Sequence, residues 1–81
     1  MDGVNTNMEG IMIRQQDIVE ALESLVDRST LLDVMTALEL VCYEKAEHIH
    51  ANWQDENMAK VWQNAGKSIY KATAKIETLG I

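Results

Sequence analysis

The stretch TLLDVMTALELVCYEKAEHIHANW, residues 30–53, contains neither proline nor glycine and repeats apolar side chains at helical spacing. Thr30 followed by Asp33 is typical of a helix start, because a hydroxyl there can accept hydrogen bonds from the free amides of the first turn. We therefore predict one long helix over residues 30–53. Its main apolar stripe covers about 120° of the helix circumference and comprises Leu31, Val34, Met35, Leu38, Val41, Cys42, Ala46, Ile49 and Trp53.

A second long helix is predicted directly after this stretch, over residues 56–79. Asp55 precedes it as a cap, and Gly80 stands where a left-handed terminating residue is expected. Its apolar residues recur in alternating steps of four and three, the spacing of packed antiparallel helices: Met58, Trp62, Ala65, Ile69, Ala72, Ile76 and Leu79. Because the turn between the two helices is short, they should form an antiparallel hairpin roughly 35 Å long.

Two features refine this hairpin. Gly66 weakens the second helix by about 1 kcal/mol relative to alanine, so a close approach of the two helices is the expected compensation. Trp53 and Trp62 flank the turn, and we expect both to close that end of the hairpin.

The N-terminal part of the chain predicts a shorter helix over residues 8–27, preceded by a flexible segment 1–7. Ile18, Leu22 and Leu25 lie on one stripe at helical spacing, and Asp17 followed by Glu20 resembles a helix-start pair. No segment alternates in the manner of a strand. The chain is thus predicted to be one all-α domain over residues 1–81, in which a hairpin of two long helices and a shorter N-terminal helix assemble into an oligomeric bundle.

Length and composition favour self-association. A chain of 81 residues has little core, and small domains often gain stability from disulfides, metals or oligomers. Cys42 is the single cysteine, so an intrachain disulfide is impossible and a zinc site of paired cysteines is not indicated. The N-terminus does not resemble a secretory signal and no apolar run is long enough for a membrane span, which predicts a cytoplasmic protein without a membrane partner.

The helix over residues 30–53 carries apolar residues beyond its main stripe. Leu40 lies roughly opposite Leu31 and Ile49, and Leu32 and Tyr43 flank that second face. We predict Leu32, Leu40 and Tyr43 as a subunit interface, in which paired hairpins form a homodimer. A monomeric three-helix bundle is the alternative, and the N-terminal helix either packs within its own chain or is exchanged.

The charge is unevenly distributed. The net charge is −6, and residues 1–54 carry ten acidic against three basic residues. Such a chain is not expected to bind nucleic acid directly, because that requires clustered lysines and arginines. An acidic face could instead meet a protein with a basic surface. Its candidate residues are Glu20, Glu23, Asp27, Glu44 and Glu47.

Paired glutamates offer one possible chemistry. Glu20 with Glu23 and Glu44 with Glu47 form two Glu-x-x-Glu spacings, and Glu47 with His50 forms a Glu-x-x-His spacing. The two glutamate pairs resemble those of helical nucleotide pyrophosphatases, which hold magnesium with Glu-x-x-Glu followed by Glu-x-x-Asp; here the second motif ends in glutamate instead. Metal carboxylates in helix bundles project inward, whereas all four glutamates are predicted to point away from the apolar stripes. We therefore predict no metal site, no cofactor and no catalytic residue.

The sequence favours a non-enzymatic binding or regulatory protein that acts through protein–protein contacts. In size and charge the chain resembles phage-encoded inhibitors of host defence, such as anti-CRISPR proteins, which occupy basic grooves of nucleic-acid-binding machinery. The alternative is a metal-dependent nucleotide hydrolase, or a small-ligand or nucleotide binder, assembled between subunits. The identity of the partner and the number of subunits are left open.

Overall fold

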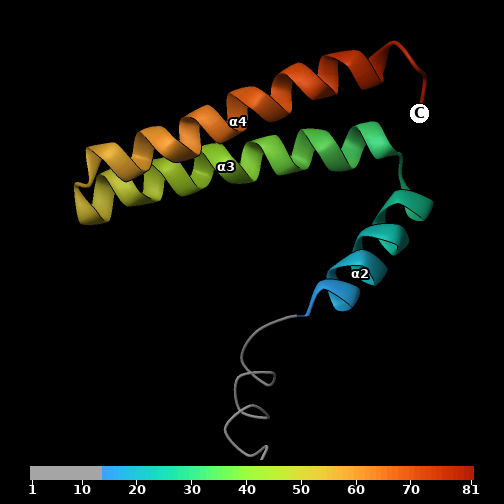
Figure 1. Ribbon diagram of the computed structural model, residues 1–81, viewed down its shortest axis with the longest axis horizontal. Coiled ribbons are helices and arrows are strands. Elements are labelled where there is room, and N and C mark those ends of the chain that lie inside the picture. The colour runs from blue at the N-terminus through green and yellow to red at the C-terminus, as the bar shows by residue number, and fades with distance from the viewer. Residues whose placement is uncertain (1–13) are drawn as a thin grey trace, which may run out of the picture.

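The computed structural model describes residues 14–81, which form three helices: α2 (Gln15–Arg28), α3 (Leu31–Trp53) and α4 (Glu56–Glu77) (Figure 1). The prediction of an all-helical chain is confirmed for these residues. The segment 1–7 and the beginning of the helix predicted over residues 8–27 lie outside the described residues. None of the helices of residues 14–81 combines the length and the apolar character that a membrane-spanning helix needs.

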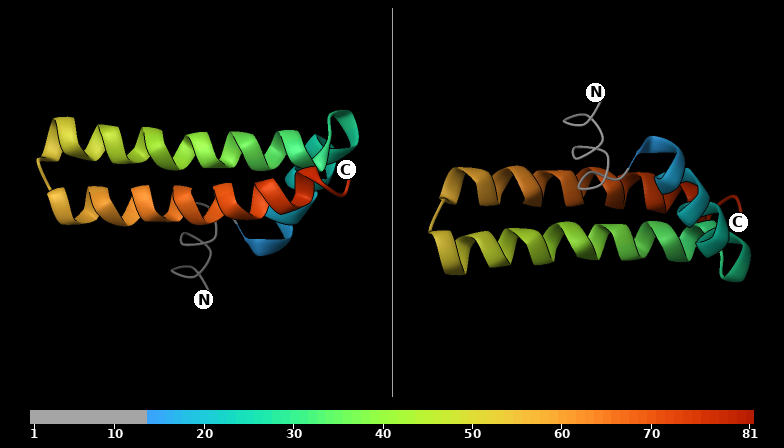
Figure 2. Two further views of the ribbon diagram at one scale, coloured as in Figure 1. Left: turned by 90° about the horizontal axis from the view of Figure 1, so that it is seen from above. Right: turned by 90° about the horizontal axis from the view of Figure 1, so that it is seen from below.

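Helices α3 and α4 form the predicted antiparallel hairpin and lie side by side along their length (Figures 1 and 2). Gln54 makes the turn with a left-handed backbone, φ 53°, and its amide donates to the Ile49 carbonyl at 3.0 Å. Asp55 then caps α4, since its Oδ1 accepts from the Met58 amide at 3.0 Å. The turn is thus closed by groups that satisfy the free ends of both helices.

The beginning of α3 is also capped as predicted. The Thr30 side chain accepts a hydrogen bond from the Asp33 amide at 2.9 Å, and Thr30 itself has an extended backbone. The helix proper begins one residue after the predicted start, at Leu31. Thr30 therefore supplies one of the hydrogen bonds that the first turn of α3 lacks.

Replacing Thr30 by alanine should lower the free energy of unfolding by about 1 kcal/mol, because the Asp33 amide loses its acceptor. Urea unfolding followed by circular dichroism, with all variants at one protein concentration, measures this loss. Thr36→Ala is the matched control, since Thr36 is an exposed residue inside α3 where alanine is the better helix former. An equal loss in the two variants would contradict the capping role.

The C-terminal end of α4 is shorter than predicted. The helix ends at Glu77, not at residue 79, and the amides of Thr78 and Leu79 donate to carbonyls of its last turn. Gly80 adopts the predicted left-handed backbone, φ 79°. The chain then turns back to α3, where the Leu32 amide donates to the Ile81 carbonyl at 3.0 Å. This bond joins the C-terminus to the beginning of α3.

Small residues form the centre of the contact between α3 and α4. The buried side chains are Cys42 and Ala46 on α3 and Ala59 and Thr73 on α4, and Gly66 is buried among them. The predicted stripes were therefore wrong in detail. Leu38 and Val41 of α3 remain 44% and 45% exposed, and Met58 of α4 and Leu79, just beyond the end of α4, are also exposed. The helix surfaces meet where side chains are smallest, because small residues let two helix backbones approach closely.

The space at Gly66 is filled by a side chain of α3, the ring of Tyr43, and the expected close approach of the two helices there stays a prediction. A Cβ atom on Gly66 would lie 2.8 Å from Cδ1 and 2.9 Å from Cζ of the Tyr43 ring. The prediction that Tyr43 points away from α4 was wrong, since the absent side chain of Gly66 opens a place for the ring. Partial burial there, together with the carboxylate of Glu39, raises the pKa of the Tyr43 phenol above its ordinary value of 10.0.

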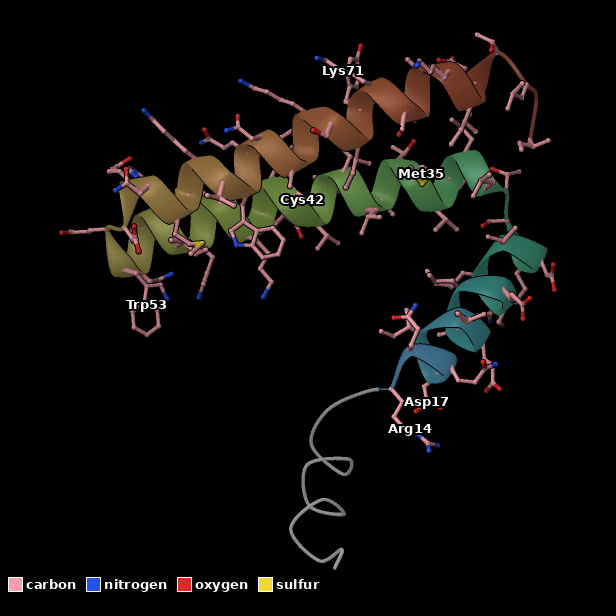
Figure 3. All side chains as sticks on the ribbon, viewed as in Figure 1. Arg14, Asp17, Met35, Cys42, Trp53 and Lys71 are labelled. Carbon is pink, nitrogen blue, oxygen red and sulfur yellow. The ribbon has the colours of Figure 1, made fainter. Side chains whose placement is uncertain are left out.

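The two tryptophans differ in their environments. Trp62 is half-buried and recurs at three- and four-residue steps with Ala59 and Gly66, on the side of α4 that faces α3. Trp53 is 72% exposed and projects away from the hairpin near the turn (Figure 3). The expectation that both rings close this end of the hairpin was therefore wrong for Trp53.

Candidate binding surface

Helix α2 leaves the hairpin at the end where the C-terminus lies and diverges from α3 (Figures 1 and 2). Ser29 ends α2, since both its amide and its hydroxyl donate to the Leu25 carbonyl, at 3.0 and 2.6 Å. Thr30 caps α3 immediately afterwards. The direction of the chain thus changes within two residues, and only the C-terminal part of α2 comes near α3.

The divergence leaves one side of α2 uncovered. Its apolar residues lie within about 120° of the helix circumference; they are Ile18, Val19, Leu22, Leu25 and Val26, and we call them the α2 stripe. Four of them, all but Val26, are 36% to 45% exposed. An amphipathic helix normally buries such a stripe against its own domain, and here residues 14–81 cover only part of it.

Facing this stripe is an open apolar cleft of about 300 Å³ between α2 and α3. We call it the α2–α3 cleft. Helix α2 contributes Leu22 and Leu25, and α3 contributes Val34, Ala37, Leu38 and Val41, while Ser29 and Asp33 lie at the closed end. The predicted stripe of α3 is therefore divided between two neighbours, because Cys42 and Ala46 face α4 whereas Leu38 and Val41 face α2.

The chemistry of the α2–α3 cleft favours apolar side chains as its occupants. Sites for small polar ligands combine an apolar lining with convergent polar groups that orient the ligand. Among residues 14–81, the polar residues that line this cleft are Ser29 and Asp33, and the Ser29 hydroxyl is already bonded to the Leu25 carbonyl. The cleft can therefore exclude water from inserted aliphatic groups and offers little to orient a polar molecule.

The same side of α3 becomes polar beyond Val41. A shallow hollow there is lined by Val41, Glu44, Lys45 and His48. The His48 ring nitrogen Nδ1 lies 3.0 Å from the Asn52 side-chain amide, one turn further along α3. The apolar part of this face thus extends from Val34 to Val41 and is bounded by charged and polar groups.

The acidic residues predicted as a partner-binding face occupy two separate helices. Glu20, Glu23 and Asp27 are exposed and share one side of α2, opposite the α2 stripe. Glu44 and Glu47 are exposed on α3. We call the first three residues the α2 acidic face, because helical spacing places their carboxylates within about 60° of one another.

Neither the paired glutamates nor the histidines form a cluster in the described part of the chain. Within residues 14–81, no three His, Cys, Asp or Glu side chains gather closely enough to hold a metal ion. His50 instead lies 2.8 Å from a carboxylate oxygen of Glu56 across the turn of the hairpin. Cys42 is buried between α3 and α4.

The three residues predicted as a subunit interface do not share one environment. Leu40 is 56% exposed on a side of α3 away from the α2–α3 cleft. Leu32 is half-buried near the C-terminus, where its amide bonds to Ile81. Tyr43 packs on Gly66. Of the three, only Leu40 offers a largely exposed apolar side chain, and a role for it in subunit contacts stays a prediction.

The sequence analysis placed the cleft-forming residues of α3 in the same stripe as the residues that face α4, and so missed the cleft. Val34, Leu38 and Val41 follow one another at steps of four and three, and they lie well to one side of Met35, Cys42 and Ala46 on the helix circumference. This angular separation on the helix circumference is a feature of the sequence from which the second face could have been predicted. It indicates two apolar faces on α3, one for each neighbouring helix, where a single broad stripe was predicted.

Comparisons with known proteins found no relative of this chain. No family model, no curated protein and no solved structure matches the chain significantly.

Proposed function

We propose that this protein is a non-enzymatic binding protein that acts through protein–protein contacts made by α2 and the α2–α3 cleft. The observation that carries the proposal is the half-exposed α2 stripe beside an open apolar cleft. Contiguous exposed apolar surface with a polar margin is typical of protein-interaction sites. An amphipathic helix that inserts apolar side chains into a groove is one of the common modes of recognition.

The α2 acidic face supplies the second element of the proposal. When the α2 stripe is covered, Glu20, Glu23 and Asp27 still point outward from the opposite side of α2. Such a face attracts a partner with a basic surface, and complementary charge raises the rate of encounter. Basic grooves of nucleic-acid-binding machinery have this character, so an inhibitor of the anti-CRISPR type is one form that the proposed function could take.

Neutralising the α2 acidic face should weaken binding of the basic partner about 10-fold, since each exposed charge pair contributes about 0.2–1 kcal/mol. The triple variant Glu20→Gln, Glu23→Gln, Asp27→Asn tests this. Proteins retained from a lysate of the source cells by the immobilised wild type are identified and purified. Their affinities for wild type and variant are then measured by calorimetry from about 0.05 to 0.5 M salt, where exposed charges are increasingly screened.

The double variant Glu44→Gln, Glu47→Gln is the control, because it removes exposed carboxylates from α3 instead of α2. The proposal expects wild-type binding from the control and an affinity for wild type that falls as salt rises. It is wrong if no protein is retained above the level of the empty matrix. Binding that depends neither on salt nor on the three α2 carboxylates would also overturn it.

A further inference from the structure

The described chain lacks a core of ordinary size. Its buried apolar residues are Cys42, Ala46 and Ala59, and no large side chain is fully buried within residues 14–81. The radius of gyration is 16.0 Å, whereas a compact chain of this length has about 11 to 12 Å. The extents are 49 × 37 × 15 Å, and the smallest of them leaves room for a single layer of helices. The three helices therefore have no second layer of their own against which to pack.

The exposed area is large enough to build such a layer from another chain. The accessible surface is 6486 Å², about 1,600 Å² more than the roughly 4,900 Å² expected of a compact 9.1 kDa monomer. A stable interface of standard size buries about 800 Å² on each partner. The excess surface of one chain therefore exceeds what one side of a stable dimer needs.

The α2 stripe and the floor of the α2–α3 cleft match one another in length and chemistry. Ile18 to Leu25 and Val34 to Val41 each span eight residues, whose seven steps cover about 10.5 Å along a helix. Both segments present aliphatic side chains, and the charged residues of α2 lie on its opposite side. A twofold interface requires a surface that is complementary to itself, and this pair of segments meets that requirement because each chain carries both.

We propose that a second copy of the chain occupies the α2–α3 cleft, with the α2 stripe of each protomer inserted against Leu38 and Val41 of the other. This inference rests on the proposed function and names the occupant of its apolar surface. The two α2 helices and two α3 helices form the shared core. The α2 acidic faces of both protomers point outward, so the dimer presents two copies of the surface that meets the basic partner.

Self-association through this contact should depend on salt in the opposite direction from binding of the basic partner. The contact between protomers is apolar, while each chain carries a net charge of −6. Salt screens the repulsion between the two chains, so self-association should be unchanged or stronger at higher salt. Binding to a basic partner should weaken under the same conditions, which allows the two contacts to be separated by experiment.

The first test compares Val41→Glu with Leu40→Glu by analytical ultracentrifugation. Val41 lies on the floor of the cleft and its neighbour Leu40 lies outside it, although both are about half-exposed. Wild type should sediment as a dimer at about 50 μM. Val41→Glu should raise the dimer dissociation constant about 100-fold, because an unpaired carboxylate would be buried, and Leu40→Glu should leave it unchanged. Circular dichroism confirms that both variants keep their helices.

The second test asks whether the contact is exchanged between chains, and it does not require a disruptive charge. Two variants in a Cys42→Ser background, one with Leu22→Cys and one with Val41→Cys, are mixed and oxidised. Their thiols are on different chains, so a disulfide-linked heterodimer reports the exchanged contact. Leu22→Cys mixed with Leu40→Cys is the matched control and should give far less crosslinked product.

Three outcomes overturn the inference. A wild-type monomer at about 50 μM does so directly, and dissociation caused by Leu40→Glu but not by Val41→Glu assigns the dimer to another face. Failure of the Leu22→Cys and Val41→Cys pair to crosslink above its control means that α2 does not enter the cleft of a second copy. The proposed function survives each of these results if the basic partner still binds through the α2 acidic face, and it fails separately if that binding is absent.

Discussion

Gly66→Ala should destabilise the folded protein by about 1 to 2 kcal/mol, even though alanine is the better helix former by about 1 kcal/mol. The new methyl group would enter the space of the Tyr43 ring, less than 3 Å from Cδ1 and Cζ. The ring is half-buried between α3 and α4, so it has little freedom to yield. Steric overlap is therefore expected to exceed the gain in helix propensity.

The effect of Gly66→Ala on the free energy of unfolding should reverse its sign once the Tyr43 ring is removed. In a Tyr43→Ala background, the methyl group of Gly66→Ala meets no aromatic ring, and the helix-propensity gain of about 1 kcal/mol should appear as a stabilisation. Urea unfolding of wild type, both single variants and the double variant completes the cycle. All four proteins are compared at one concentration, because self-association would otherwise change the apparent stability.

The sign reversal distinguishes this contact from a general sensitivity of α4. If Gly66→Ala stabilises the protein in both backgrounds, the ring does not occupy the space above Gly66. If it destabilises both equally, another neighbour limits the site. Lys67→Ala, one residue along on the exposed side of α4, serves as the control and should change the unfolding free energy by less than about 0.5 kcal/mol.

Local hydrogen bonding was the most predictable part of the fold. The caps Thr30 and Asp55 were recognised because a side-chain acceptor placed before a helical segment satisfies the first free amides, whatever the helix later packs against. The left-handed backbone of Gly80 follows from the absence of a Cβ atom in the same local way. Such features depend on a few adjacent residues and can be read directly from the sequence.

The faces of α3 were less predictable, since they depend on where two other helices lie. Spacing alone shows which residues share a side of a helix, and it groups Leu38 with Cys42 as readily as with Val41. Their separation follows from the position of α4 and from the change of direction at Ser29, whose φ and ψ are −137° and −121°. No sequence pattern determines that direction. The α2–α3 cleft results from it and was therefore not predictable.

The position of Tyr43 is a second case in which helical spacing does not show what a side chain packs against. By helical position it lies at the edge of the side that faces α4, where either solvent or a neighbouring helix can receive it. Gly66 decides the outcome from a distant part of the sequence, because the missing side chain leaves a depression that fits a ring. A close contact at Gly66 was predictable, while the identity of the side chain that fills the space was not.

Trp62→Ala should lower the free energy of unfolding by about 2 to 3 kcal/mol, whereas Trp53→Ala should change it by less than about 0.5 kcal/mol. Trp62 is half-buried on the side of α4 that faces α3. Because the buried residues within 14–81 are all small, the fold depends strongly on such large, partly covered side chains. Trp53 is 72% exposed, so its removal uncovers little apolar surface.

The two tryptophans also allow a test that does not depend on stability. In Trp53→Phe the remaining indole of Trp62 should fluoresce at shorter wavelength and be quenched less by acrylamide than the indole that remains in Trp62→Phe, because more of the Trp62 surface is shielded from water. Equal quenching of the two indoles at a concentration where the chain is monomeric would contradict the difference in burial.

Quenching of Trp53 that falls only as the protein concentration rises would place this ring in a contact between chains. In that case Trp53→Ala should weaken self-association while leaving the unfolding free energy of the monomer unchanged. The two rings would then differ in exposure because Trp62 packs within the hairpin and Trp53 packs between hairpins.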